Sequence, residues 1–234
     1  MSILANVQIR QMFSAVAPGY DRANDILSFG MHRLWRRRTV RSAHPRPGQQ
    51  ILDCATGTGD LALAFRKAVG PTGRVVGIDF SQRMINLAHA KADRTGLSAE
   101  FLVGDVTRLP FADGEFDIAA IGFGIRNVEN PPAGIREMAR VVKTGGKVVI
   151  LEFGRPEGAI FGRLYRWYSR TIIPQIGGRI TGSPAAYEYL ERSAAAFPAG
   201  EEFVELMRQA AVFEPVEPIL IMGQIAYIYV GTVG

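Results

Sequence analysis

A carboxylate, two glycines and a threonine follow a short apolar run, and their spacing suits the binding of a nucleotide-like ligand. Residues 50–52 lead into Asp53, and Gly57, Thr58 and Gly59 begin four residues later. Two glycines around one small residue let the backbone approach a ligand closely, because neither has a side chain to hold it off. Such a loop at the carboxyl end of a strand is a common cofactor site in open α/β sheets.

The same loop satisfies the fingerprint of dinucleotide-binding proteins, so a dinucleotide is one alternative. Gly57, Gly59 and Ala62 fit G-x-G-x-x-G/A, and Asp79 lies 20 residues after Gly59, where a ribose-binding acid is expected. A single match of this kind has low specificity. The fingerprint alone therefore leaves the cofactor open.

Two further acids favour S-adenosylmethionine over a dinucleotide. Asp53 precedes the glycines, where a buried carboxylate can order the loop and reach a cationic amino-acid group. Asp105 follows another strand-like run, where a carboxylate can accept a hydrogen bond from the adenine amino group. Asp53, Asp79 and Asp105 would then line one edge of a parallel sheet, each at the end of its strand.

Apolar runs that alternate with helical patterns predict the elements that position these acids. The alternation indicates βαβ units, a parallel sheet and an α/β fold. The sheet is predicted to be Rossmann-like and seven-stranded, mostly parallel with an antiparallel last strand. Expected strands are 50–54, 74–79, 100–104, 116–121, 146–152, 216–222 and 225–231, and expected helices are 60–69, 81–95, 133–143 and 201–211.

The chain is predicted to form a single domain, because no repeat, low-complexity tract or linker interrupts it. We expect an N-terminal helical cap over 1–46, a cofactor-binding core over 47–157, a helical substrate-side insertion over 158–211 and closing strands over 212–234. An insertion after the fifth strand would lie over the carboxyl edge of the sheet. With the N-terminal helices it would form a lid.

Composition indicates an ordinary globular protein, with 47% hydrophobic and 21% charged residues. The single cysteine, Cys54, fits a reducing compartment, so we expect a cytoplasmic protein. The three histidines and the cysteine are scattered, so we expect no metal site. Residues 218–234 carry no charge, but their β-branched and aromatic residues favour strands over a membrane span.

Residues 32–41 contain five arginines and account for much of the net charge of +5. A solvated helix face is one interpretation. The other is peripheral contact with anionic lipid at the inner membrane face, since the helix also carries Met31, Leu34 and Trp35. Nucleic acid is not expected as a partner, because no recognised binding module accompanies the charge.

Three further motifs resemble the ubiquinone/menaquinone biosynthesis C-methyltransferase family. They are YDRANDILSFGMHRLW over 20–35, FGIRN over 123–127, and RVVKTGGK over 140–147 running to LEF over 151–153. The resemblance continues to Phe197-Pro198 and so covers nearly the whole chain. Departures from the usual family pattern fall at Ala23, Gly122, Thr144 and Gly154. None of these positions is an expected catalytic or cofactor-binding residue.

The resemblance implies a class I S-adenosylmethionine-dependent methyltransferase fold. It also implies S-adenosylmethionine-dependent methylation of a ring carbon in a polyprenylated quinol. Demethylmenaquinol is the favoured substrate, and the demethoxy-ubiquinol precursor is an alternative. Another aromatic or lipid small molecule, and a cofactor-binding scaffold without turnover, are further alternatives. A homodimer also stays open.

The resemblance also implies roles for motif residues. Arg126 is the first catalytic candidate, because a guanidinium can stabilise a phenolate but cannot act as a base. Asn127 would fix the loop or bind a ring oxygen. His32 would act as a general base, as its unperturbed pKa near ~6.5 suits that work, or would bridge the N-terminal helices to the core.

The remaining site residues are predicted from their places in the motifs. On the substrate side we expect Tyr20, Asn24, Trp35 and Tyr187. On the cofactor side the glycine loop and Thr58 would face the amino-acid portion. Asp79 would bind the ribose, and Asp105 with the Val106 amide would hold adenine.

Overall fold

One seven-stranded sheet organises the chain, whose computed structural model describes residues 6–234 with side chains from Gln8 onward. The strands follow the order β3-β2-β1-β4-β5-β7-β6, and β7 runs antiparallel to both of its neighbours. Their bounds are β1 (Gln50–Cys54), β2 (Arg74–Asp79), β3 (Glu100–Val103), β4 (Phe116–Gly122), β5 (Val142–Phe153), β6 (Phe213–Ile221) and β7 (Ala226–Val233). The predicted seven-stranded, mostly parallel sheet is confirmed, and residues 218–234 do form strands.

Ten α-helices are assigned within residues 6–234. They are α1 (Asn6–Val16), α2 (Tyr20–Leu27), α3 (Met31–Ala43), α4 (Asp60–Val69), α5 (Gln82–Thr95), α6 (Pro131–Arg140), α7 (Arg163–Trp167), α8 (Ile173–Thr181), α9 (Pro184–Ala196) and α10 (Glu201–Ala210). Short 3₁₀ turns cover Ala17–Gly19 and Ile125–Asn127.

The bounds predicted for the third core helix, 133–143, are wrong at both ends. The side chain of Asn130 accepts a hydrogen bond from the Ala133 amide and caps the helix earlier, with Pro131 at its first position. At the other end Val142 pairs with Phe116, so β5 begins where a helix was expected. The cap and the long-range pairing therefore set the observed bounds of α6.

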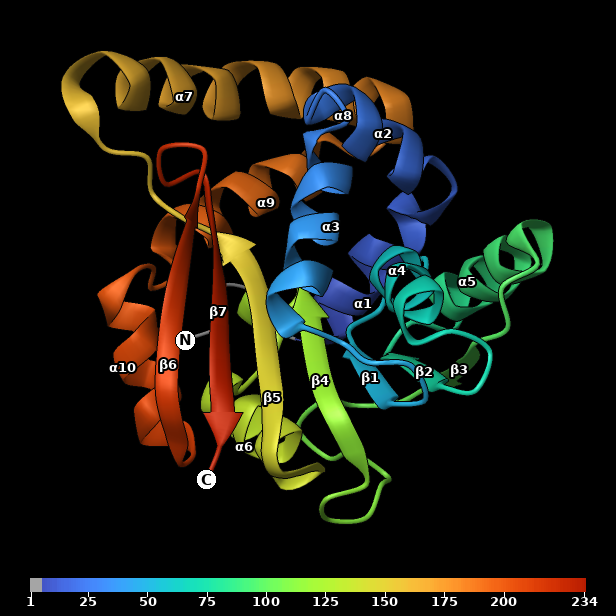
Figure 1. The fold of residues 1–234 in the computed structure, drawn as a ribbon. Helices are drawn as coiled ribbons and strands as arrows, with labels where there is room; N and C mark the ends of the chain where they lie inside the picture. Colours follow the sequence, from blue (N-terminus) through green and yellow to red (C-terminus); the bar gives the residue numbers. More distant parts are fainter. Residues whose placement is uncertain (1–5) are drawn as a thin grey trace.

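Helices lie on both faces of the sheet (Figure 1), and an apolar core lies between the helices and the sheet on each face. Trp35, Phe65 and Ile85, from α3, α4 and α5, belong to the core of one face. Met138 and Phe203, from α6 and α10, belong to that of the other. The sheet is thus covered on both sides, as a mostly parallel sheet requires.

The strand order reverses between β1 and β4, which pair in parallel with each other. From β1 the chain proceeds outward to β2 and β3, and from β4 outward to β5. The loops that follow β1 and β4 therefore diverge at the carboxyl edge of the sheet. This switch point is where α/β folds of this kind bind ligands.

A helical segment lies over that same edge (Figure 1). Residues 158–181 form one continuous helical stretch, in which wide π-helical turns at Gly158–Gly162 and Tyr168–Ile172 flank α7. Pro174 follows the second wide turn and lacks the amide hydrogen that regular helix bonding needs. A third apolar cluster, including Val16, Leu27 and Tyr187, packs α1 and α2 against α8 and α9.

Within residues 6–234, no helix is both long and apolar enough to cross a bilayer.

Candidate active site

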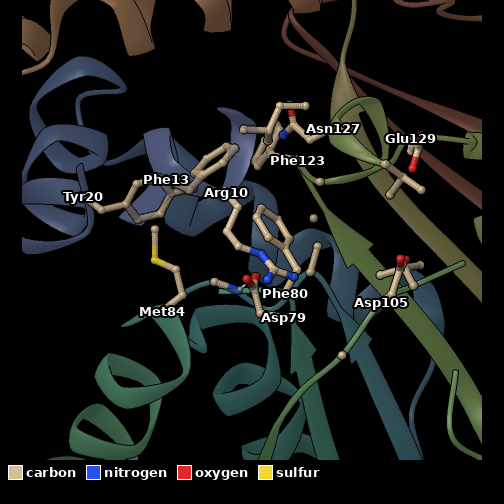
Figure 2. Close-up of a pocket in the computed structure, with 18 of the residues that line it drawn as sticks. Arg10, Phe13, Tyr20, Asp79, Phe80, Met84, Asp105, Phe123, Asn127 and Glu129 are labelled. Carbon is tan, nitrogen blue, oxygen red and sulfur yellow. Dashed lines mark hydrogen bonds between the residues drawn. The ribbon is translucent and has the colours of Figure 1, made fainter. Parts of the chain in front are cut away.

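A first cavity of about 400 Å³ lies at the switch point, in the size range of small-molecule sites. Its walls come from α1 and α2, the β1 loop, the ends of β2 and β3, and the segment after β4 (Figure 2). Lining residues include Arg10, Phe13, Tyr20, Gly57, Asp79, Phe80, Met84, Asp105, Val106, Phe123, Asn127 and Glu129. Four of the seven predicted cofactor-binding residues, Gly57, Asp79, Asp105 and Val106, thus meet in one space.

The two glycines of the β1 loop serve different purposes. Gly57 has φ +57°, lines the cavity, and a Cβ there would meet no atom within 4 Å. Its backbone can therefore face a ligand directly. Gly59 has φ +83°, and a Cβ there would lie 3.0 Å from the Phe101 ring. Gly59 thus allows the start of α4 to pack closely against Phe101 of β3.

Asp53 is buried behind the loop rather than in the cavity wall. Its Oδ2 accepts hydrogen bonds from Thr56 Oγ1 at 2.6 Å and from the Ala62 amide at 2.9 Å. Burial raises the pKa of this carboxyl to about 7. Its Oδ1 is buried without a hydrogen-bond partner among residues 6–234. The two bonds match the predicted ordering of the loop by Asp53. Asp53 lines neither cavity described here, so the structure does not bring it to a ligand's cationic group.

Asp79 joins the glycine loop to the start of α5. Its Oδ2 accepts from the Gly57 amide and its Oδ1 from the Ser81 amide, both at 2.9 Å. Burial raises the pKa of Asp79, and the nearby Arg10 charge opposes that rise. Arg10 lies over the Phe80 ring, 5.7 Å from its centroid, and points toward Asp79 (Figure 2). Each carboxylate oxygen keeps a lone pair for a further donor.

Asp105 and Val106 form the far wall of the first cavity. Asp105 is exposed, and its Oδ1 accepts from the Thr107 amide and hydroxyl, both at 2.8 Å. Val106 is buried and contributes an apolar surface. The pair thus offers one carboxylate and one apolar contact, as an adenine site requires.

Thr58 lies outside the lining of the cavity, contrary to the expectation that it faces the ligand. Its hydroxyl donates to Asp21 Oδ1 at 2.7 Å and accepts from Lys91 Nζ at 2.8 Å. Lys91 also lies 2.6 Å from carboxylate oxygens of Asp21 and Asp60. Thr58 therefore ties the loop to α2, which the local sequence pattern does not reveal.

A second, mostly apolar cavity of about 270 Å³ adjoins the first. Phe13, Tyr20 and Phe123 line both cavities. The second also includes Asn24, Leu27, Ser28, Phe29, His32, Trp35, Arg126, Phe153, Tyr165, Tyr168, Tyr187, Tyr189 and Met222. All four predicted substrate-side residues, Tyr20, Asn24, Trp35 and Tyr187, are among its lining residues.

Arg126 is held in a buried ion pair beside the second cavity. Its Nη1 lies 2.7 Å from Glu152 Oε1 and donates to the Phe123 carbonyl at 2.6 Å. Its guanidinium carbon is 5.1 Å from the centroid of the Phe153 ring. Glu152 stands near the end of β5 and also accepts from the Phe153 amide at 2.8 Å. The charge of Arg126 is thus fixed in an apolar setting at a defined place.

Three buried nitrogens among the residues that line the second cavity have no hydrogen-bond partner within residues 6–234. They are Trp35 Nε1, Arg126 Nε and Arg36 Nη1, the last of which lies 3.5 Å from Asp60 Oδ2 in an ion pair. An unpaired buried donor costs about 1–3 kcal/mol, so a ligand that accepts from it gains correspondingly. A molecule with two oxygen acceptors on an otherwise apolar body suits the two donors that have neither kind of partner, Trp35 Nε1 and Arg126 Nε.

Asn127 lines the first cavity but not the second. Its Oδ1 accepts a hydrogen bond from the Tyr189 hydroxyl at 3.2 Å, which joins the loop after β4 to α9. Burial raises the pKa of Tyr189 and raises that of Tyr187 to about 12, so both phenols are neutral. The geometry thus favours loop fixation, one of the two roles expected of Asn127.

His32 is buried at the start of α3. Its Nδ1 lies 2.6 Å from Ser28 Oγ and its Nε2 lies 3.4 Å from Asp25 Oδ1. Burial and the Arg36 charge lower the pKa of His32 to about 4. The sequence-based argument for a general base assumed an unperturbed pKa, and this premise is wrong. The contacts match the bridging role instead.

The lowered pKa of His32 predicts a loss of stability in acid. Above pH 6.5 the imidazole is neutral in both states. As the pH falls from 6.5 to about 4, the unfolded chain binds a proton that the folded chain refuses. The free energy of unfolding should fall by up to ~3 kcal/mol over this range. Urea unfolding at intervals between pH 7 and 4.5 measures it.

In His32→Asn this part of the pH dependence should disappear. His44→Asn is the matched control, because His44 is exposed and its left-handed φ of +52° suits asparagine. Equal slopes for wild type and His32→Asn would contradict the assignment.

The arginine-rich helix α3 exposes fewer apolar side chains than was expected of a membrane contact. Arg33 and Arg36 pair with Asp25 and Asp60, whereas Arg37, Arg38 and Arg41 are exposed. Of the three apolar residues expected at a membrane, Trp35 is buried, Met31 is half-buried and only Leu34 is exposed. Helical periodicity turns Trp35 toward the sheet.

Residues 6–234 contain no group of three or more His, Cys, Asp or Glu side chains that could hold a metal ion.

Several lining residues were not predicted. Arg10 and Phe13 lie on α1, where no local signal marks them. Phe80 directly follows the acid at the end of β2. Glu152 could have been found, because it is an acid near the end of a buried strand, like Asp53 and Asp79.

Known proteins are similar to this chain in sequence and in fold. Residues 1–232 match the sequence profile of the ubiE/COQ5 methyltransferase family. The chain belongs to this family. It is 51% identical to the "Ubiquinone/menaquinone biosynthesis C-methyltransferase UbiE" of Bdellovibrio bacteriovorus, over 96% of this chain and 95% of that protein. It is 44% identical to the "Demethylmenaquinone methyltransferase" of Thermus thermophilus, over 94% of this chain and 99% of that protein.

Solved structures agree on the fold. A SAM-dependent methyltransferase from Thermotoga maritima has a TM-score of 0.68 at 20% identity, covering 96% of this chain and 99% of its own. Another from Aquifex aeolicus has a TM-score of 0.61 at 18% identity, covering 85% and 89%. These structures support the fold, and membership of the ubiE/COQ5 methyltransferase family makes the chain an S-adenosylmethionine-dependent methyltransferase. The dinucleotide alternative is dropped.

Proposed function

We propose that this chain transfers a methyl group from S-adenosylmethionine to a ring carbon of a polyprenylated quinol, with demethylmenaquinol as the preferred acceptor. The observation that carries the proposal is the shared wall of the two cavities. A cavity at the glycine loop, which holds the buried Asp79 carboxylate, adjoins a mostly apolar one that is lined by the buried Arg126. The Thermus thermophilus relative's name supports the choice of acceptor.

The first cavity fits the cofactor on three observations. The Gly57 backbone faces open space, Asp79 presents a buried carboxylate, and Val106 adds an apolar wall beside Asp105. We assign the ribose to Asp79, adenine to Asp105 and Val106, and the amino-acid portion to the Gly57 loop, with Asp53 behind it. Bound there, S-adenosylmethionine supplies an electrophilic methyl group on a sulfonium.

The residues of the second cavity would activate the acceptor. A quinol ring carbon becomes nucleophilic when the neighbouring hydroxyl loses its proton, and a phenol of pKa ~10 does so rarely at neutral pH. Arg126 Nε is an unpartnered, charged donor in an apolar setting, so it can stabilise the resulting oxyanion. Glu152 holds that guanidinium in place through the 2.7 Å ion pair.

Trp35 Nε1 is the natural partner for the second quinol oxygen. Within residues 6–234 it has no hydrogen-bond partner, and unlike Arg36 Nη1 it has no ion-pair partner either. The aromatic rings of Tyr20 and Phe123 would position the quinol ring at the boundary between the cavities. Such positioning alone can contribute on the order of 7–11 kcal/mol to lowering the barrier.

The test is turnover of methyl-labelled S-adenosylmethionine with chemically reduced demethylmenaquinone and, separately, with the reduced ubiquinone precursor. We expect a product heavier by one methylene unit from demethylmenaquinol, and a lower kcat/KM for the other acceptor. The oxidised quinones are the controls and should give no product, because they lack the electron-rich carbon. Cofactor binding without product from either quinol would overturn the proposal.

Peripheral contact with an anionic membrane and a homodimer are part of the same proposal. A polyprenylated acceptor resides in the bilayer, which supports membrane contact.

Sedimentation velocity in the absence of lipid tests the homodimer, and a purely monomeric species over a wide concentration range would contradict it.

A further inference from the structure

An apolar helical face is exposed on the insertion above the second cavity. Ile160, Leu164 and Trp167 have exposed fractions of 84%, 60% and 55%. They stand at positions i, i+4 and i+7, so they share one side of the helical stretch 158–172. Large apolar residues gathered in this way on a soluble surface indicate an interaction site.

Apolar residues from two other segments extend this face. Phe29, between α2 and α3, is 81% exposed, and its ring centroid lies 6.3 Å from that of Tyr168. Met222, in the turn between β6 and β7, is also exposed. A Cβ at the adjacent Gly223 would lie 3.2 Å from the Phe161 ring, so this turn contacts the helix. Figure 1 shows α7 across the top of the molecule, with the β6–β7 turn beneath it.

The charges on the helical stretch 158–172 are positive, whereas the exposed Glu157 directly precedes it. The segment 158–172 contains Arg163, Arg166 and Arg170 and no Asp or Glu. Arg170 pairs with Glu191 at 3.0 Å, whereas Arg163 and Arg166 make no ion pair within residues 6–234. Exposed Trp and Leu flanked by arginine are typical of helices that lie in the interface of an anionic bilayer.

We propose that this docking face, formed by Ile160, Phe161, Leu164 and Trp167 with Phe29 and Met222, binds the surface of an anionic lipid bilayer. The arginines would contact the headgroups, and the apolar side chains would enter the boundary of the acyl region. Complementary charge favours lipid over a second copy of this chain, which would bring the same arginines together.

The docking face also adjoins the mouth of the second cavity. Phe29 and Met222 belong to both, and Tyr168 lines the cavity one residue after the exposed Trp167. A quinol head can then enter the cavity while its prenyl chain stays in the lipid. This consequence rests on the proposed function, whereas the docking itself does not.

The two tryptophans make the docking directly measurable. Trp167 is exposed and Trp35 is buried, so a change in emission on adding vesicles reports mainly on Trp167. We use vesicles of phosphatidylcholine with phosphatidylglycerol, and of phosphatidylcholine alone. We expect a blue shift with the anionic vesicles, and quenching when their acyl chains carry bromine. The same full-length chain is used throughout.

Variants locate the surface. Ile160→Ser/Leu164→Ser keeps Trp167 as the probe and should weaken vesicle binding at least tenfold. Arg163→Glu should weaken it by more than about fivefold, the effect of removing one basic residue near the surface. Because Arg163 is exposed and unpaired, it also serves if the double variant does not fold. Matched controls are the exposed Val212→Ser, away from the face, and Leu34→Ser/Arg37→Glu on α3, and neither should change binding.

Three results would overturn the proposal. The first is no binding of wild type to anionic vesicles. The second is loss of binding only in the α3 control. The third is a change from dimer to monomer in the Ile160→Ser/Leu164→Ser variant, which would make the face a contact between copies of the chain.

Turnover separates this proposal from the proposed function. The docking variants should retain kcat/KM for a short-chain, water-soluble quinol and lose at least tenfold for a long-chain quinol in vesicles. Vesicle binding without turnover of any quinol would leave the docking face standing and refute the proposed function. Turnover of soluble quinol without vesicle binding would support the proposed function and refute the docking face.

Discussion

Replacing Arg126 with alanine is expected to lower kcat at least about 100-fold, the usual effect of removing one donor to a developing oxyanion. It should also lower the free energy of unfolding by about 3–5 kcal/mol, because Glu152 is left as a buried, unpaired charge. Steady-state turnover of the reduced quinol measures the first effect, and urea unfolding the second. Cofactor affinity should stay close to that of wild type.

A double variant distinguishes chemistry from folding. Arg126→Met/Glu152→Gln removes both charges and keeps an acceptor for the Phe153 amide, which now bonds to Glu152. We expect stability to recover while activity stays low. Lys143→Ala is the matched control, because its ion pair with Asp117 is at the surface and should be worth less than about 1 kcal/mol. Wild-type turnover in the double variant would remove Arg126 from the reaction.

Replacing Asp79 with alanine is expected to weaken S-adenosylmethionine binding by about 100-fold or more. The substitution removes the acceptor for the Gly57 and Ser81 amides together with the expected ribose contact. A hydrogen bond to a charged group is worth about 1.5–3 kcal/mol. The cofactor would lose at least two such bonds, one from each ribose hydroxyl. Isothermal titration calorimetry with the cofactor alone measures the change.

Asp79→Asn should lie between wild type and alanine, because one amide oxygen is retained. Asp93→Ala, an exposed acid on α5, is the control and should bind as wild type does. If Asp79→Ala binds the cofactor normally, the assignment of the first cavity is wrong.

Local sequence patterns were sufficient for the sheet and for the acids at its edge. Strands read from apolar runs end where Asp53 and Asp79 stand, and the parallel arrangement brings those ends together. The glycine loop was equally readable, because its positive φ values demand glycine. These features depend on residues that are near one another in the chain.

Contacts between distant segments were not readable in this way. The Arg126–Glu152 pair joins the turn after β4 to the end of β5, and Thr58 bonds to Asp21 across 37 residues. The pKa of His32 depends on burial and on Arg36, which periodicity does not determine. A pattern shows which face of an element is buried, but it does not show which side chains from other elements meet it there.

Helix α1 forms part of both cavity walls, which has a thermodynamic consequence. Ile9 and Arg10 face the first cavity, Met12 and Val16 the second, and Phe13 both. A ligand that packs against α1 from one side reduces the conformational entropy that a ligand on the other side must still remove. We therefore expect positive cooperativity between methyl donor and acceptor, and linkage requires each to raise the affinity of the other by the same factor.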